Sequence, residues 1–248
     1  MIENKILAMI SNLLGLTSSK QESILIPKEF VESEIPEIDS DELYLLNNST
    51  EYKVQIFDGK LKVEEYKRDE ICILLLPNGY LAGSDGGEFG GGKLIYIPNE
   101  NPENFTIIKD AAMRYIFKFK DKIYFIEGFW NMLSHYGDLY ELEIEGDKFT
   151  YKELVSFHDT PLAYTIYHDK ILIVTNETLY IITDSKKEPI FKDNFLDYFY
   201  SNSIAAFDDE NIFIGVRGGI VKLDLINETV KFYKNINKDF KNTSKLKL

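Results

Sequence analysis

The feature that most constrains the fold of this chain is an internal repeat. Four segments share one order: a short apolar strand, a tight polar turn, a second strand, a connection, and then a third and a fourth strand. The turns begin at Asn78, Asp121, Asp169 and Glu210, and the third strands carry Leu94, Leu139, Leu179 and Ile220, which lie 45, 40 and 41 residues apart. Short strands rich in Ile, Tyr, Phe and Val between Gly, Asn or Asp are typical of antiparallel sheets. The repeat therefore predicts an all-β chain.

A period of about 40–45 residues with four strands per unit resembles that of the β-propeller repeat proteins. The resemblance covers about residues 68–235. It is one of architecture alone, because the Gly-His and Trp-Asp signatures of one subclass are absent from the sequence. It implies a ring of four-stranded sheets, or blades, each of which buries its faces against its neighbours. We therefore expect strands such as 71–76 and 171–174 to be buried on both faces.

Residues 21–67 are less regular, and we interpret them as a degenerate first blade, which gives five blades in all. The segments that look like strands are 23–26, 43–46, 52–57 and 61–66, and Asp58-Gly59 predicts a hairpin turn between the last two. A four-bladed ring with an N-terminal subdomain, a six-bladed ring with split blades and a β-sandwich remain alternatives. The sequence thus predicts one propeller domain over residues 21–240.

Both ends of the chain differ from this body. Apolar residues recur at helical spacing before Gly15, namely Ile2, Ile6, Met9, Ile10 and Leu13. Residues 1–20 are therefore expected to form an amphipathic helix docked on the body. The apolar stretch is too short to span a bilayer and lacks a cleavage site, so we expect neither membrane binding nor secretion. Residues 241–248 are polar and basic and are expected to form a frayed tail.

Composition restricts the partners. The 248 residues include 28 Lys and Arg against 41 Asp and Glu, a formal net charge of −13. This charge opposes nucleic-acid binding, which depends on neutralising phosphates, and it favours a basic protein partner. The single cysteine, Cys72, cannot form an intramolecular disulfide and fits a reducing compartment. We therefore expect a cytoplasmic protein that is a monomer on its own.

Two neighbouring connections between second and third strands are unusually long. They are the glycine-rich run 83–92 and the segment 127–137, whereas the corresponding connections around Asn176 and Arg217 are short. Connections of this kind emerge on one face of a propeller, and aromatic residues are enriched at binding hot spots. The predicted partner-binding residues are the aromatic residues and the histidine of these connections, Phe89, Phe129, Trp130, His135 and Tyr136, together with Glu32, Glu34 and Glu37 of an acidic N-terminal segment. The alternative for Trp130 is packing over a gap between blades.

The sequence carries no catalytic or metal-binding signature. His135, His158 and His168 lack metal-ligand spacing, and no Ser lies in a G-x-S-x-G elbow. Cys72 lies inside an apolar strand and is expected to be a buried, unreactive side chain. The run 83–92 precedes a strand, whereas a phosphate-binding loop would precede a helix, and whether this run binds a ligand through Asp85 and Glu88 stays open. We expect no cofactor, no metal and no enzymatic activity.

These properties favour a non-catalytic protein-binding module. The specific hypothesis is an immunity protein that neutralises a basic nuclease toxin by occluding its active site. The acidity, the small size and the missing catalytic set are similar in character to the acidic, β-rich inhibitors that bacteria make against secreted nuclease toxins. One alternative is a lectin-like carbohydrate-binding propeller, which predicts similar aromatic pockets in every blade. The other is a propeller hydrolase or lyase that uses carboxylates at the ring centre.

Overall fold

The computed structural model describes residues 24–67, 71–87, 91–131, 134–192 and 195–237. The predicted N-terminal helix over 1–20 and the basic tail over 241–248 lie outside these residues. The described chain is all-β, with several four-stranded antiparallel sheets and two short helices, α2 (Asp41–Asn47) and α3 (Phe195–Phe199). No helix of the described chain combines the length and the apolar character that a bilayer crossing requires.

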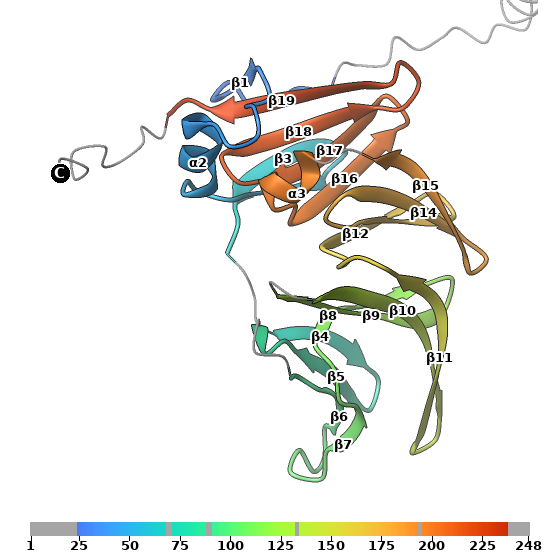
Figure 1. The fold of residues 1–248 in the computed structure, drawn as a ribbon. Coiled ribbons are helices and arrows are strands. Elements are labelled where there is room, and N and C mark those ends of the chain that lie inside the picture. Colours follow the sequence, from blue (N-terminus) through green and yellow to red (C-terminus); the bar gives the residue numbers. More distant parts are fainter. Residues whose placement is uncertain (1–23, 68–70, 88–90, 132–133, 193–194, 238–248) are drawn as a thin grey trace, which may run out of the picture.

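The strands form five sheets that follow one another along the chain (Figure 1). The first is the hairpin β2 (Tyr52–Phe57) and β3 (Lys60–Glu65). Next come β4 (Ile71–Leu76), β5 (Gly79–Ser84), β6 (Leu94–Pro98) and β7 (Thr106–Lys109). The third sheet contains β8 (Met113–Phe119), β9 (Lys122–Asn131), β10 (Ser134–Glu145) and β11 (Lys148–Phe157). The fourth contains β12 (Ala163–Tyr167), β13 (Lys170–Val174), β14 (Thr178–Thr183) and β15 (Lys186–Lys192). The last contains β16 (Ser203–Asp208), β17 (Asn211–Val216), β18 (Gly219–Asp224) and β19 (Thr229–Asn235), with β1 (Phe30–Ser33) at its edge.

The repeat predicted from the sequence is present in the structure. Leu94, Leu139, Leu179 and Ile220 lie in β6, β10, β14 and β18, each the third strand of its sheet, and all four side chains are fully buried. The predicted turn at Asp58-Gly59 is also confirmed, because both residues have positive φ between β2 and β3, as a tight hairpin turn requires. The period in the sequence thus marks equivalent positions in successive sheets.

The last sheet joins the two ends of the described chain. β1 pairs antiparallel with β19, and Phe30 lies opposite Asn235. The Phe30 side chain is buried and meets the Tyr52 ring edge-on at 5.0 Å, so β1 also contacts the hairpin. This sheet therefore contains five strands, in the order β1-β19-β18-β17-β16.

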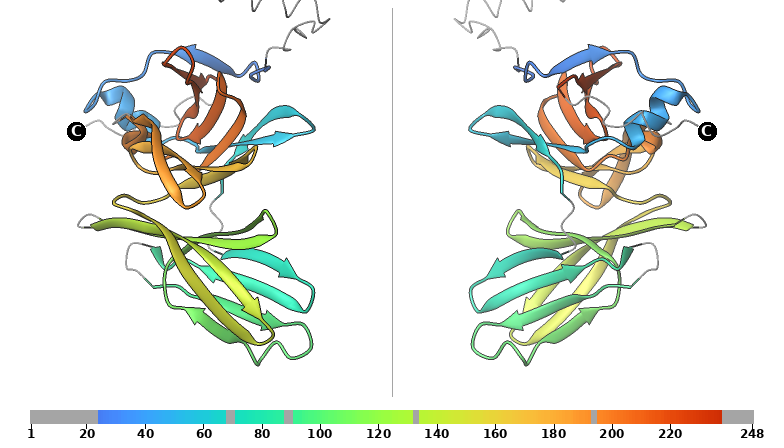
Figure 2. Two further views of the ribbon diagram at one scale, coloured as in Figure 1. Left: turned by 90° about the vertical axis from the view of Figure 1, so that its right-hand side faces the viewer. Right: turned by 90° about the vertical axis from the view of Figure 1, so that its left-hand side faces the viewer.

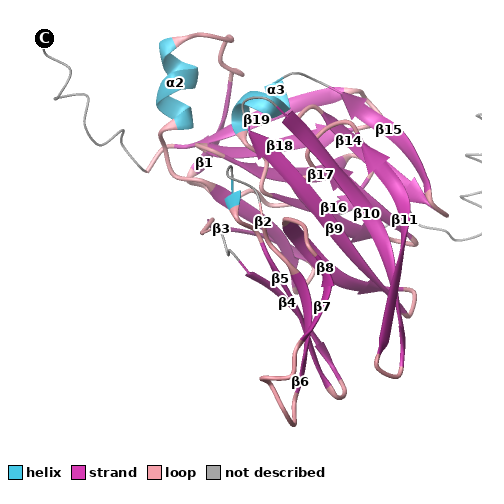
Figure 3. Cartoon of the chain, turned by 60° about the horizontal axis from the view of Figure 1, so that its bottom comes forward, coloured by secondary structure: helices cyan, strands magenta, loops and turns pink. Residues whose placement is uncertain are grey.

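Residues 43–46 are helical, which corrects the prediction of a strand there. Ser40 is the N-cap of α2, with its Oγ accepting a hydrogen bond from the Leu43 amide at 3.1 Å. Leu43 and Leu46 are buried in one cluster with Leu196 of α3, so the two helices lie side by side (Figure 3). An apolar run of four residues is compatible with a strand or with the buried side of a helix. The N-cap at Ser40 favours the helix.

Successive sheets pack face to face, and the strand β13 shows how. Ile171 and Ile173 point into a core shared with the third sheet, whereas Leu172 and Val174 point into a core shared with the last sheet. All four side chains are buried, which confirms the prediction of burial on both faces for 171–174.

The series of sheets does not close into a ring within the described chain. The hairpin β2–β3 packs on β16, β17 and β18 of the last sheet. On the opposite end of the series, β4 exposes Ile71, Ile73 and Leu75, with 58%, 58% and 75% of their surfaces accessible. The prediction that strand 71–76 is buried on both faces is therefore wrong, because no described sheet covers its second face. Figure 2 shows the hairpin and β4 on the same side of the molecule.

Candidate functional site

A cavity of about 590 Å³ lies among the last three sheets and the two helices. Its lining comes from segments that are far apart in the sequence, from Asn47 to Arg217. The ends of the second and third strands and the turns between them contribute Trp130 of β9, His135 of β10, Asn176, Glu177 and Arg217. The segments between sheets contribute Asp159, Leu162, Asp197, Tyr198, Tyr200, Ser201 and Asn202. The connections from three successive sheets thus meet in one pocket, as the repeat predicts for one face of a propeller.

Segment 127–137 was expected to be a loop, and it is the end of a long hairpin. β9 runs to Asn131 and β10 begins at Ser134, and Trp130 lies opposite His135 in the ladder. Their rings are 6.2 Å apart. Cross-strand aromatic pairs stabilise such a hairpin. β9 and β10 therefore continue past the ends of their pairing with β8 and β11, and they carry both side chains to the pocket.

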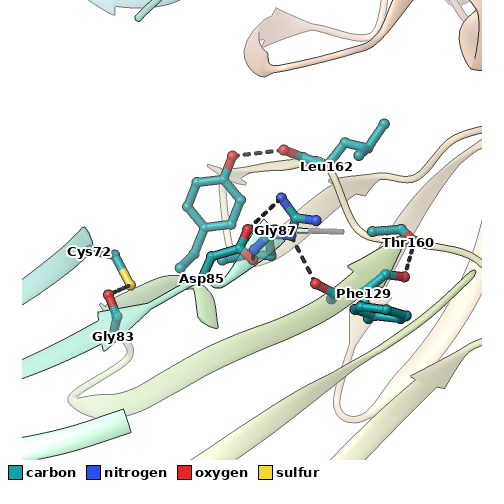
Figure 4. A network of polar contacts seen from close by, with 10 residues as sticks. Cys72, Gly83, Asp85, Gly87, Phe129, Thr160 and Leu162 are labelled. Carbon is teal, nitrogen blue, oxygen red and sulfur yellow. Dashed lines mark hydrogen bonds and ion pairs between the residues drawn. The ribbon is translucent and has the colours of Figure 1, made fainter. Parts of the chain in front are cut away.

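The wall beside this hairpin is set by a close approach of backbone. Gly128 lies opposite Gly137, and a Cβ at Gly137 would be 2.3 Å from Pro161 Cδ. The connection between β11 and β12 packs against the two glycines. From this connection, Thr160 Oγ1 donates a hydrogen bond to the Phe129 carbonyl at 2.7 Å (Figure 4). The two glycines therefore fix the position of Asp159 and its neighbours at the pocket.

A second wall is held by an arginine. Arg114 Nη1 lies 2.9 Å from Asp85 Oδ2, and its Nε donates to the Gly128 carbonyl at 3.0 Å. The glycine-rich run therefore contributes Asp85 as an ion-pair partner, while Phe89 and Glu88 lie outside the described residues. Next to Arg114, the Tyr115 hydroxyl donates to the Leu162 carbonyl at 2.7 Å (Figure 4). Burial raises the pKa of Tyr115, so its phenol stays a donor at any physiological pH.

The third wall is an arginine stacked on an aromatic ring. The Arg217 guanidinium lies 3.6 Å from the centre of the Tyr200 ring, and its Nε donates to Glu51 Oε1 at 2.9 Å. Trp130 meets the same Tyr200 ring edge-on at 6.2 Å. Stacking and a fixed carboxylate partner hold Arg217 in one orientation, so this wall is preorganised.

Carboxylates and amides make up the floor. Asn176 Nδ2 donates to Asp197 Oδ1 at 2.9 Å, and the Asp159 carboxylate accepts from the backbone amides of Thr160 and Glu177. Four carboxylates line the pocket, from Glu51, Asp159, Glu177 and Asp197, against two arginines that are both ion-paired. The pocket therefore has excess negative charge.

Several buried polar atoms in the pocket have no protein partner. Three of them belong to residues that are themselves buried: Asn176 Oδ1, Ser201 Oγ and Asn202 Nδ2, in residues that are 8%, 5% and 8% exposed. A buried donor or acceptor without a partner is unfavourable and rare, and a ligand is one way to satisfy it. These three atoms lie within one cavity and are available to hydrogen-bond a bound group.

The predicted partner-binding residues divide into three groups. Trp130 and His135 line the pocket. Phe129 and Tyr136 lie next to each other on the same hairpin, with rings 5.5 Å apart, but do not line it. Glu32, Glu34 and Glu37 are exposed on and after β1, away from the pocket lining, and Glu32 pairs with Lys231 at 3.1 Å.

Sequence reasoning did not identify most of the pocket. Tyr200, Asn202 and Asp197 lie in the connection between β15 and β16, where nothing in the pattern distinguishes them from other polar loop residues. Asn176 and Arg217 were correctly placed in connections between second and third strands, but these connections are short, and the binding site was predicted on the longer ones. In the described part of the chain, no group of three or more His, Cys, Asp or Glu side chains is placed to hold a metal ion.

No family model matches this sequence, and no curated protein matches it. Among solved structures, the chain is similar to one described as "Crystal Structure of the N-terminal Domain of Nup159", with a TM-score of 0.40 and 9% identity. The similarity covers 74% of this chain and 61% of that chain. A similarity of this size says nothing about what this chain binds.

Proposed function

We propose that this protein is a non-catalytic protein-binding module whose pocket receives a cationic side chain of a basic partner. The architecture proposed with it is an open five-bladed β-propeller in which the hairpin β2–β3 is the degenerate first blade. The observation that carries the binding proposal is the unbalanced charge of the pocket. Both arginines are ion-paired and Glu177 lies 3.5 Å from Lys192 Nζ, which leaves Asp159 and Asp197 to attract a positive charge.

Aromatic side chains complete a site for a lysine or an arginine. Trp130 and Tyr198 line the same cavity as Tyr200, on whose ring Arg217 is already stacked. The face of an aromatic ring attracts a cation, and its apolar surface packs against the methylene groups of a long basic side chain. The unpartnered Asn176 Oδ1 is an acceptor, which suits the N–H donors of an ammonium or guanidinium group.

The charge of the whole chain supports the same partner class. A net charge of −13 attracts a basic protein over long range, and a basic nuclease toxin is the partner that we propose. The protein would then act as its immunity protein: carboxylates engage the Lys and Arg that the toxin uses for nucleic acid and so occlude its active site. A nuclease encoded beside this gene is the first partner to test.

A carbohydrate ligand is the second candidate, and a specific observation favours it. Asn202 Nδ2 is a buried donor without a partner, and it shares the pocket with Trp130 and Tyr200. Amides that bind hydroxyls beside rings that stack on sugars are the ingredients of a lectin-like site. The excess of carboxylates is the reason to rank it second.

Trp130 is the only tryptophan of the chain and lines the pocket, so its fluorescence reports occupancy directly. The experiment is a titration of the full chain with an Arg- and Lys-rich peptide and, separately, with a panel of neutral mono- and oligosaccharides. We expect the basic peptide to change the emission and the sugars to leave it unchanged. Asp197→Asn should weaken peptide binding about tenfold, or ~1.4 kcal/mol.

The matched control is Asp147→Asn, the same change in the exposed turn between β10 and β11, which should leave binding unchanged. Emission that responds to a sugar and not to the peptide would replace the proposal by the lectin-like function. Equal weakening by both Asp→Asn variants would show that binding depends on net charge alone and that the pocket is not the site.

A further inference from the structure

One face of the sheet β4–β7 is apolar and uncovered. Ile71, Ile73 and Leu75 on β4 are mostly exposed, and directly opposite them on β5 lie Ser84, Ala82 and Tyr80. Residues opposite each other in an antiparallel sheet point to the same face, so the face continues across the sheet. We call it the open face; its apolar residues are Ile71, Ile73, Leu75, Tyr80, Ala82, Ile95, Ile97 and Ile107.

The other face of the same sheet is packed normally. Leu81 and Leu94 are fully buried there in one core with Phe125 of the third sheet, and Cys72 and Leu74 pack against that core. In a β-strand alternate residues point to opposite sides, so an apolar residue at every position of β4 implies a cover on both sides. Only one cover is present among the described residues.

The neighbouring hairpin does not provide the second cover. The apolar side chains of β2 and β3 point toward the last sheet, where Tyr52, Val54 and Leu61 are buried. The opposite side of the hairpin is polar: Glu64 lies 2.8 Å from Lys62 Nζ and 3.7 Å from Lys53 Nζ, and it accepts a hydrogen bond from Gln55. Docking this side on the open face would strip water from charged groups, which is unfavourable.

We propose that residues 2–14 cover the open face. These residues lie outside the described part of the chain, and the sequence predicts that they form an amphipathic helix with the stripe Ile2, Ile6, Met9, Ile10 and Leu13. A helix of thirteen residues is about 20 Å long, and a six-residue strand such as β4 spans about 20 Å. The stripe and the strand therefore match in length as well as in character.

The path of the chain allows this docking. The described chain begins at Ile24, which packs with Ile26 against the cluster of Tyr52, Val54 and Leu61. That cluster holds the hairpin, and only residues 66–70 separate the end of β3 from β4. Residues 15–23 can span on the order of 30 Å when extended, whereas residues 66–70 limit the distance from the end of β3 to the start of β4 to about 20 Å.

A photo-crosslinker at position 73 tests the proposal in the full chain. With p-benzoylphenylalanine in place of Ile73, irradiation should join this position to a peptide within residues 2–14 of the same molecule, identified by mass spectrometry. The matched control is the same probe at Ile166, an exposed residue of β12, which should give no such product. Crosslinks from position 73 to a second copy, or to any other part of the chain, would overturn the proposal.

A thermal double-mutant cycle provides an independent measurement. Ile73→Thr keeps a β-branched residue in an exposed strand, so on its own it does not threaten folding. We expect it to lower the melting temperature by about 3 °C or more in the natural chain and by much less in a chain carrying Ile6→Ser and Ile10→Ser, because the two sites then no longer touch. Ile166→Thr should have the same small effect in both chains. Equal effects of Ile73→Thr in both chains would show that residues 2–14 do not cover this face. Neither test involves the pocket, so the outcome is separate from that of the proposed function.

Discussion

Cys72 shows at the residue scale how differently the two sides of β4 are placed. Its neighbours Ile71 and Ile73 are exposed, whereas its thiol points to the packed side, with Sγ 3.6 Å from the Gly83 carbonyl (Figure 4). Burial is the main cause that raises the pKa of the Cys72 thiol from its usual range to about 11. The side chain is half-buried rather than fully buried, so the expected small buried residue is confirmed only in part.

The raised pKa predicts slow chemistry at this thiol. The thiolate is the reactive form, so at pH 8 iodoacetamide should alkylate Cys72 at least tenfold more slowly in the folded protein than in urea. The rate in the folded protein should rise with pH up to about 11. Because the folded pKa is the higher one, the protonated thiol contributes stability that is fully present below the unfolded pKa and lost as pH rises through about 11. Equal alkylation rates in buffer and in urea at pH 8 would contradict this account.

At the scale of elements, the turn between β17 and β18 is locked to helix α2. Gly218 has a φ of 76°, and a Cβ added there would lie 2.2 Å from Leu46 Cδ2, a buried side chain of α2. Both the backbone conformation and the contact exclude a larger residue at this position. The turn also carries Arg217 into the pocket, so the helix and the pocket wall are fixed together.

Gly218→Ala is therefore expected to lower the free energy of unfolding by about 2–4 kcal/mol, the sum of backbone strain and overpacking. The control is Gly146→Ala in the turn between β10 and β11, where φ is 62° and nothing lies within 4 Å of the added Cβ. That variant should cost only about 1 kcal/mol, the strain alone. Urea denaturation measures both, and similar losses would mean that Leu46 moves aside.

Elements also show what the sequence could and could not predict. The strands with tight turns, such as the one at Asp58-Gly59, were predictable because the turn chemistry is local. α2 was missed because its apolar run of Leu43 to Leu46 was weighed without the cap at Ser40. The hairpin over 127–137 was missed because this segment was interpreted as a long connection between two strands. The close approach of Pro161 to Gly137 comes from the next connection along the chain, which the local sequence does not show.

For the whole molecule, the 40-residue period predicted the positions of four sheets, since each repeat must bury the same third-strand residue. It could not predict the pocket, because Tyr200 and Asn202 come together with Trp130 only when three sheets are stacked. It also could not predict the uncovered side of β4, since apolar residues such as Ile73 fit a buried strand equally well. The pocket and the uncovered face depend on packing between sheets that are far apart in the sequence, and the pattern within one repeat does not describe that packing.

Net charge allows a kinetic prediction at this scale. Raising salt from about 50 to about 500 mM shortens the Debye length from roughly 14 to roughly 4 Å, so association of a basic partner should slow markedly while dissociation changes little. Stopped-flow measurement of Trp130 emission gives both rates. Changing Glu32, Glu34 and Glu37 together to Lys alters the net charge from −13 to −7 away from the pocket, and should slow association in the same way. Association that does not respond to salt would remove the electrostatic part of the proposed function.

The pairing of β1 with β19 has a consequence for the order of events during synthesis. Phe30 leaves the ribosome about two hundred residues before Asn235, its partner in the ladder. At typical rates of 5–20 residues per second, this is a wait on the order of 10–40 s, during which the middle sheets can form from complete, contiguous segments. The last sheet has no such option, since its edge strand is made first and its other strands last. The nascent chain must therefore keep β1 unpaired and the Phe30 side chain uncovered until synthesis is almost finished, which makes this stage the one at which a chaperone would have most to protect.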